Sequence, residues 1–228
     1  MAILPRVWVT RTEPGATRTA ERVRALGLTP VVQPLLAVRY IDAAINLNGV
    51  GALAFTSRNG VEGFARRHAG RSLPAFAVGD ATAVAAREQG FDRVVSADGD
   101  LEALATLLRR AHAPGDGIVL HPGPARPAGN LAALAGTAIV VRSVVVYSTE
   151  PTPDPAPPFD IVLIHSPRAA TRLAENSGGV DVSALTAVAI SPAAAQPVEA
   201  LGFGRLIVAD RPDEPAMMAA LGKSARRV

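Results

Sequence analysis

The chain of 228 residues contains no cysteine, which excludes disulfide bonds, thiolate metal sites and a cysteine nucleophile. It also lacks an uninterrupted apolar run of about 18 residues, so that no membrane-spanning helix is expected. The first residues, MAILPRVWVT, lack the basic segment, the long apolar segment and the cleavage site of a secretory signal. We therefore expect a cytoplasmic protein that does not bind membranes.

Aromatic residues and lysine are scarce. Nine residues are Phe, Trp or Tyr, and 22 of the 23 basic residues are arginine. No basic run is interleaved with aromatics, which argues against a surface on which nucleic-acid bases stack. Arginine favours bidentate contacts with carboxylates and phosphates, although a codon bias toward arginine would give the same composition. We expect an anionic small molecule as the partner, and no nucleic acid.

Short apolar runs alternate with helical patterns along almost the whole chain. Apolar runs without strict alternation are typical of parallel strands that are covered on both faces. Strand–helix–strand order with short turns indicates a parallel sheet in an α/β fold. The expected strands are residues 6–10, 31–38, 51–56, 74–78, 92–96, 117–121, 137–147, 160–165, 186–190 and 205–209.

The sequence also contains an internal repeat. LAFTSRNGVEGFA (53–65) matches LIHSPRAATRLA (163–174) at an offset of 109, and FAVGDATAVAAREQGFDRVVSAD (76–98) matches VAISPAAAQPVEALGFGRLIVAD (188–210) at an offset of 112. The first strand and helix have a counterpart that begins at Gly117. We infer that a five-stranded unit has been duplicated.

The order of the repeated motifs predicts two domains, one of them discontinuous. Residues 1–36 find their strand partners in residues 151–228, and residues 41–143 form an inserted domain. Residues 37–40 and 144–150 are interdomain crossings. As two short segments of opposite direction, they are expected to pair as a two-stranded ladder.

A closed eight-fold α/β barrel is the competing fold. The chain length suits it poorly, and the strands at 31–38 and 137–147 lack a following helix of normal size. For the two-domain fold, short crossings predict that the domains rotate as rigid bodies about them. A ligand favours the closed form only if it contacts both domains.

Polar turns follow most of the expected strands, at the edge where open parallel sheets bind ligands. Each turn opens a helix, whose free N–H groups and partial positive charge attract carboxylate or phosphate. Ser, Thr and Asp are also ordinary helix N-caps, so that a single turn is explained by capping alone. Several such turns together predict an anion site. They are TRTEPG (10–15), TSRNG (56–60), VGDAT (78–82), HPGPARPAG (121–129), HSPRA (165–169), ISPAA (190–194) and ADRPDE (209–214).

Common catalytic and cofactor motifs are absent. The chain has no phosphate-binding loop that ends in Gly-Lys-Ser/Thr, no G-x-S-x-G and no H-E-x-x-H. The four histidines form no pair with metal-ligand spacing, and His121 and His165 are expected only to end strands. We expect neither a metal nor a cofactor.

The motifs in this order resemble the uroporphyrinogen-III synthase family, and the likeness covers essentially the full chain. It rests on VTR (9–11), PLLAV (34–38), FTSRNGVEGF (55–64), AVGDATAVAAREQGF (77–91), VVVYSTEP (144–151), IHSPRAA (164–170) and AISPAAAQPVEALGF (189–203). The resemblance implies two similar flavodoxin-like parallel-sheet domains, joined by a two-stranded ladder, with the active site in the cleft between them.

The resemblance also implies a reaction. The substrate would be hydroxymethylbilane, a linear tetrapyrrole with an acetate and a propionate on each ring, and no metal or cofactor would take part. The terminal hydroxyl leaves as water, a spiro intermediate forms, and the ring closes with ring D inverted. Because spontaneous closure gives the uninverted isomer, the main task of the protein is to position the substrate. We expect the protein to be a monomer.

Tyr147 is the expected catalytic residue. It matches the family's tyrosine in VVVYSTEP, and an ordinary phenol is protonated at neutral pH and can donate a proton to the departing hydroxyl. The alternative is an aromatic side chain that only packs between the domains. The residues expected to contact substrate carboxylates are Arg11, Thr56, Ser57, Gly79, Ser166 and Ser191.

The alternative function is that of a non-catalytic, hinge-type binding protein whose two domains close around an anionic metabolite. The duplication, the arginines and the two crossings fit this alternative equally well. The family resemblance favours the enzyme.

Overall fold

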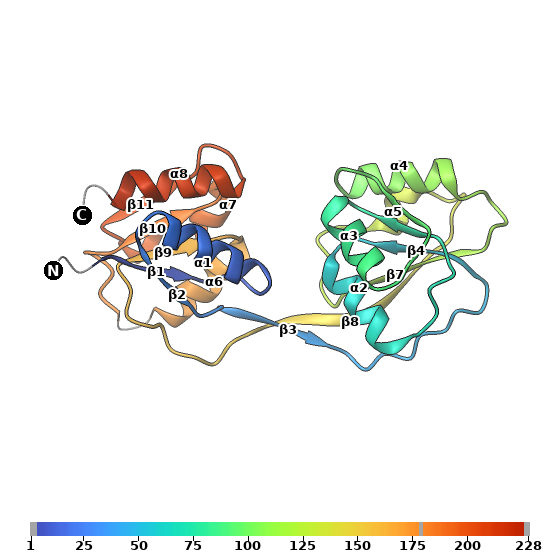
Figure 1. Ribbon diagram of the computed structural model, residues 1–228, viewed down its shortest axis with the longest axis horizontal. Coiled ribbons are helices and arrows are strands. Elements are labelled where there is room, and N and C mark those ends of the chain that lie inside the picture. Colours follow the sequence, from blue (N-terminus) through green and yellow to red (C-terminus); the bar gives the residue numbers. More distant parts are fainter. Residues whose placement is uncertain (1–3, 178–179, 226–228) are drawn as a thin grey trace. The chain divides into compact units, whose positions relative to one another are not determined.

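The computed structural model describes residues 4–177 and 180–225. The chain forms two α/β units, each with its own sheet and core (Figure 1). Unit 1 consists of Met1–Ala37 and Glu150–Val228, and unit 2 of Val38–Thr149. In the described part of the chain, no helix is long and apolar enough to cross a bilayer.

Unit 1 contains a parallel sheet with the strand order β11-β10-β9-β1-β2. The strands are β1 (Arg6–Val9), β2 (Thr29–Val32), β9 (Ile161–Ile164), β10 (Thr186–Ala189) and β11 (Arg205–Val208). The helices are α1 (Gly15–Ala25), α6 (Pro167–Asn176), α7 (Pro192–Ala195), the 3-10 helix η1 (Gln196–Leu201) and α8 (Glu214–Ala225).

Alternate residues of β1 point to opposite faces of this sheet. Val7 and Val9 pack with α1 and α8, whereas Trp8 packs with α6, α7 and η1. Trp8 is fully buried, its indole Nε1 donates a hydrogen bond to the Gln33 carbonyl at 2.7 Å, and its ring centroid lies 5.1 Å from that of Phe159. Burial on both faces explains why the strand is apolar at every central position.

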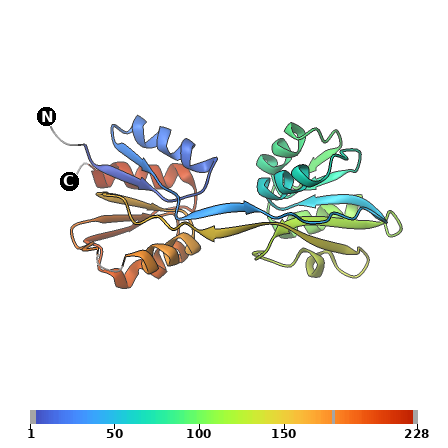
Figure 2. The same ribbon diagram turned by 90° about the horizontal axis from the view of Figure 1, so that it is seen from below.

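Unit 2 contains most of a second sheet with the strand order β3-β8-β7-β4-β5-β6, in which the first residues of β3 and the last residues of β8 belong to unit 1. The strands are β3 (Leu36–Tyr40), β4 (Val50–Phe55), β5 (Ala75–Ala77), β6 (Val94–Ser96), β7 (Ile118–Pro124) and β8 (Val141–Pro151). The helices are α2 (Arg58–Arg67), α3 (Asp80–Glu88), α4 (Leu101–Ala111) and α5 (Leu131–Ala135). The strands from β8 to β6 are parallel, and β3 runs against β8 at the edge (Figure 2).

Helices cover both faces of this second sheet. On one face, Leu104 and Leu108 of α4 pack with Ala52 and Ala54 of β4, together with α5. On the other face, Phe55, the last residue of β4, packs with helices α2 and α3. The expected α/β class with two similar parallel-sheet domains and a strand ladder is confirmed.

The strand registers support the inferred duplication. Leu53 of β4 lies opposite Ala75 of β5 in unit 2, and Val162 of β9 lies opposite Ala187 of β10 in unit 1. Leu53 and Val162 are 109 positions apart, and Ala75 and Ala187 are 112 positions apart, which are the two offsets of the sequence repeat. The strand order β8-β7-β4-β5-β6 repeats β2-β1-β9-β10-β11, with the first two strands moved to the end of the unit in the chain.

Two of the expected strands differ most from the structure. The run 31–38 is split into β2, which ends at Val32, and β3, which begins at Leu36. Pro34 lies in the gap and has no N–H to donate to a sheet. The run 137–147 begins only at Val141, since Gly136 ends α5 with a positive φ of 80°, and the strand then continues to Pro151.

Candidate functional site

The predicted serines all cap helices at the carboxyl ends of parallel strands. The Oγ atoms of Ser57, Ser166 and Ser191 accept backbone hydrogen bonds at 3.1, 3.2 and 3.3 Å from the third residue of α2, α6 and α7, respectively. Gly79 precedes α3 and has no side chain to cap it. Each hydroxyl satisfies one N–H group of its first turn, and Pro167 and Pro192, the first residues of α6 and α7, have no N–H, so these two helix starts offer fewer donors than α2.

The side chain of Tyr147, a residue of β8, lies beside the start of α2 in unit 2. Its Oη is 3.0 Å from Ser57 Oγ, and its side chain is largely buried, with 7% of the residue exposed. Strand β8 has one extra residue here, because Gly123 of β7 lies opposite Val145 and the next residue lies opposite Tyr147. The structure thus brings together two of the predicted site residues, the tyrosine and the serine that caps α2.

A close contact between α2 and β8 fixes this arrangement. A Cβ atom on Gly63 would lie 2.7 Å from Val146 Cγ2, so that only glycine allows the helix to approach the strand this closely. The side chain of Glu62 on the same helix accepts a hydrogen bond of 2.7 Å from the Tyr40 hydroxyl of β3. Helix α2 is therefore attached to both strands of the ladder.

A second polar chain crosses from β4 to β8 through a buried histidine. His121 Nε2 lies 3.0 Å from Thr56 Oγ1, and His121 Nδ1 lies 3.3 Å from Ser143 Oγ. Burial lowers the pKa of His121, which favours the neutral imidazole. A neutral imidazole has one donor and one acceptor nitrogen, and so it can link two hydroxyl groups.

The position of His121 differs from the expectation. The histidine does not end its strand but lies inside β7, which continues to Pro124. Helices α2 and α5 follow β4 and β7 on opposite faces of the sheet. The Thr56–His121 contact therefore lies at the point where the direction of connection reverses, which is where open α/β sheets bind ligands.

In unit 1, Arg11 follows β1 and is held by Glu214 at the start of α8. Arg11 Nη1 lies 2.8 Å from Glu214 Oε2, Thr19 Oγ1 donates to Glu214 Oε1 at 2.6 Å, and His165 Nε2 lies 3.3 Å from Oε2. Burial would raise the pKa of Glu214, but its interactions with His165, Thr19 and Arg11 together lower it to about 2. Glu214 is therefore a carboxylate at neutral pH.

The guanidinium group of Arg11 lies against the first residue of α1. A Cβ atom on Gly15 would lie 2.5 Å from Arg11 Nε, so glycine leaves the room that the guanidinium group occupies. One of the Arg11 nitrogens already binds an internal carboxylate. Contact with a substrate carboxylate would therefore use the remaining N–H groups of Arg11.

The predicted site residues fall into two groups. Thr56, Ser57, Gly79 and Tyr147 belong to unit 2, and Arg11, Ser166 and Ser191 belong to unit 1. Sequence reasoning missed Glu214, although it is the last residue of the polar turn ADRPDE. It also missed Ser143, which lies within an apolar run. Among the described residues, no group of three or more His, Asp and Glu side chains is placed to hold a metal ion.

Replacing the capping serines separates capping from contact with Tyr147. Ser57→Ala and Ser166→Ala are each expected to lower the free energy of unfolding by about 1 kcal/mol, because each removes one N-cap. Only Ser57 also contacts the phenol. We therefore expect a small loss in the turnover of hydroxymethylbilane, the expected substrate, in both variants, and the larger loss in Ser57→Ala. Urea unfolding measures the loss of stability and steady-state kinetics the loss of turnover. A larger loss of turnover in Ser166→Ala than in Ser57→Ala would contradict a role for the contact between Ser57 and Tyr147.

Comparisons with known proteins identify relatives of the chain. The family model described as uroporphyrinogen-III synthase HemD matches residues 17–219. The crystal structure of uroporphyrinogen-III synthetase from Helicobacter pylori is similar with a TM-score of 0.69 and 18% identity, over 97% of this chain and 99% of that chain. A mutant uroporphyrinogen III synthase from Thermus thermophilus is similar with a TM-score of 0.55 and 16% identity, over 99% of each chain. A search of curated proteins found no match.

Proposed function

Because the chain belongs to the uroporphyrinogen-III synthase family, we propose that it cyclises hydroxymethylbilane with inversion of ring D and loss of water. The match of the family model over residues 17–219 is the observation that carries this proposal. The reaction is that of a cyclising hydro-lyase. We further propose that the protein acts as a monomer in the cytoplasm, without a metal or a cofactor.

Tyr147 is proposed to donate the proton that lets the terminal hydroxyl leave. The carbon–oxygen bond breaks with its electron pair on oxygen, and the phenol proton completes the water molecule. The lone pair of the pyrrole nitrogen fills the electron demand at the carbon, and the pyrrole N–H proton then passes to the phenolate of Tyr147, which leaves a neutral azafulvene and restores the phenol. The hydrogen bond with Ser57 supports this role, because it orients the phenol.

The helix starts are proposed to hold the carboxylates of the substrate. The first turns of α2, α3, α6 and α7 each present backbone N–H groups at a strand end. Holding the chain in one conformation lets ring D be attacked at its substituted carbon, which gives the spiro intermediate. Positioning of this kind lowers a barrier without a strong acid, base or metal.

The isomer of the product tests the proposal. Hydroxymethylbilane is supplied fresh to the protein, and the products are oxidised to porphyrins and separated. We expect mainly the type III isomer, whereas a heat-inactivated sample gives the type I isomer by spontaneous closure. If the active sample also gives only the type I isomer, the proposal is wrong. The alternative function, binding of an anionic metabolite without catalysis, is then favoured.

A further inference from the structure

A pocket of about 440 Å³ lies within unit 2, beside the buried histidine. Its apolar lining includes Pro124 of β7, Pro127 of the loop that follows it and Val145 of β8. His121 and Ser143, whose side chains lie 3.3 Å apart, form its polar end, and Asn130 is a further polar lining residue. The volume lies within the range of small-molecule sites, which are mostly apolar with a few placed polar groups.

The lining of this pocket is uncharged. Among its described lining residues there is no Asp, Glu, Lys or Arg, and burial lowers the pKa of His121, which favours the neutral ring. A carboxylate buried here would lose its hydration without gaining an opposite charge, which is costly. A flat, neutral ring with one N–H donor fits better. Its faces would contact proline and valine side chains, and its N–H would reach the polar end.

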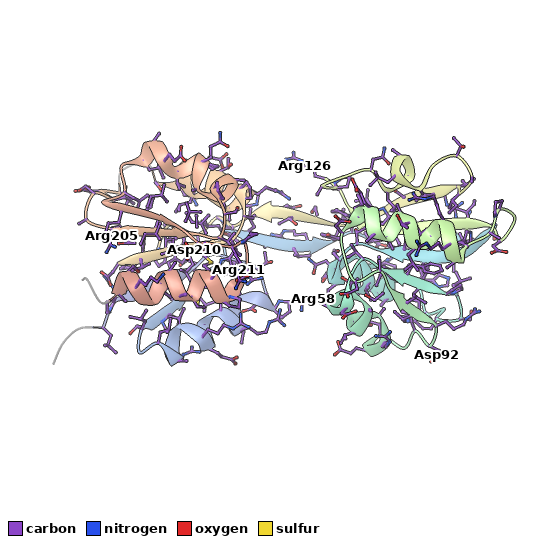
Figure 3. All side chains as sticks on the ribbon, turned by 90° about the horizontal axis from the view of Figure 1, so that it is seen from above. Arg58, Asp92, Arg126, Arg205, Asp210 and Arg211 are labelled. Carbon is purple, nitrogen blue, oxygen red and sulfur yellow. The ribbon has the colours of Figure 1, made fainter. Side chains whose placement is uncertain are left out.

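Positive charge lies close to the pocket in the sequence but not among its lining residues. Arg126 stands between the two lining prolines and is exposed. Figure 3 shows Arg126 and Arg58, the first residue of α2, at the same end of unit 2. Acidic side chains of a ring seated in the pocket would therefore be attracted toward this end of the unit, where they stay hydrated.

We propose that this pocket holds one pyrrole ring of the linear tetrapyrrole. The ring N–H donates to Ser143 Oγ, because both nitrogens of His121 already face the hydroxyls of Thr56 and Ser143, and the acetate and propionate of that ring point outward. The identity of the ligand rests on the proposed function. The substrate site would then consist of the helix starts, which are proposed to hold carboxylates, and of a separate subsite for one ring.

Binding of a single ring tests the subsite directly. The probe is a monopyrrole that carries one acetate and one propionate, titrated into the full chain while the amide resonances of Ser143 and Val145 are followed by NMR. Val145→Phe places a larger side chain in the pocket, and Val140→Phe is the matched control, since Val140 is 62% exposed and does not line the pocket. Hexanedioate is the control ligand, with two carboxylates and no ring.

We expect the monopyrrole to shift both resonances in the wild type and in Val140→Phe. In Val145→Phe its affinity should fall at least about tenfold, and the KM for hydroxymethylbilane should rise by a similar factor, as for a misfit in an apolar pocket. Failure of the monopyrrole to bind the wild type, equal binding by Val145→Phe, or equal shifts with hexanedioate would each overturn the proposal.

A second variant covers the case in which Val145→Phe does not fold. Ser143→Ala removes only the hydroxyl, and it should weaken the monopyrrole about three- to tenfold, the range of one hydrogen bond. Unchanged affinity in Ser143→Ala would then reject the subsite. The binding result does not depend on the isomer assay. If the wild type forms only type I product but binds the monopyrrole in this pocket, the proposed function fails and the ring site stands.

Discussion

Tyr147→Phe is expected to lower turnover of hydroxymethylbilane by about 100-fold, the lower end of the range for a positioned general acid. The low end applies because the lone pair of the pyrrole nitrogen already assists departure of the hydroxyl. Phenylalanine retains the packing of the largely buried ring and removes only the hydroxyl that contacts Ser57. Steady-state kinetics and the fraction of type III isomer give the measurement.

The other tyrosine of the chain provides the control. Tyr40 donates its hydroxyl hydrogen bond to Glu62, and the guanidinium carbon of Arg66 lies 4.4 Å from the centre of its ring. Tyr40→Phe leaves Glu62 paired with Arg66, and its turnover should stay near that of the wild type. Equal turnover in Tyr147→Phe and the wild type would reject the acid role and leave Tyr147 as a packing residue.

Glu214→Gln is expected to destabilise the protein at neutral pH by about 2 kcal/mol, a value reduced for solvent screening. The carboxylate of Glu214 meets Arg11, Thr19 and His165, and these contacts lower its pKa to about 2 in the folded chain. The pKa of a carboxyl group in the unfolded chain is about 4.3. The stabilisation is thus complete above the unfolded value and is lost as the pH falls through about 2.

Urea unfolding between neutral and acidic pH measures this difference. The gap between wild type and Glu214→Gln should close as the pH falls from about 4.3 toward about 2, because the wild-type carboxylate then takes up its proton. Glu199→Gln is the matched control, since Glu199 is an exposed glutamate of the same unit. A gap that stays constant over this range would show that the charge of Glu214 contributes nothing.

Much of the fold could be predicted because its signals are local. A short buried strand is apolar at successive positions, and a capping serine stands directly before its helix, as at Ser57 and Ser166. The repeat then gives the pairing of the strands, since two copies with one pattern must form similar sheets. The split at Pro34 was missed because the apolar residues on both sides read as one run.

Contacts between distant residues could not be predicted. Thr56 and His121 are 65 positions apart, and their hydrogen bond depends on the pairing of β4 with β7. Arg11 and Glu214 are 203 positions apart. Nothing in either neighbourhood distinguishes Glu214 from an ordinary acidic residue at the start of a helix, and only the completed sheet brings the two side chains together.

The permuted order of the duplicated strands has a consequence for synthesis of the chain. Unit 2 is continuous, and its strands β4 to β8 find their partners within it. Strand β1 of unit 1 pairs with β9, whose residues follow the whole of unit 2. Domains that leave the ribosome first usually fold first, but here the amino-terminal segment has to wait with one strand edge unpaired. The interior of the gene therefore encodes the unit that can fold first, and the two ends of the chain close the other unit last.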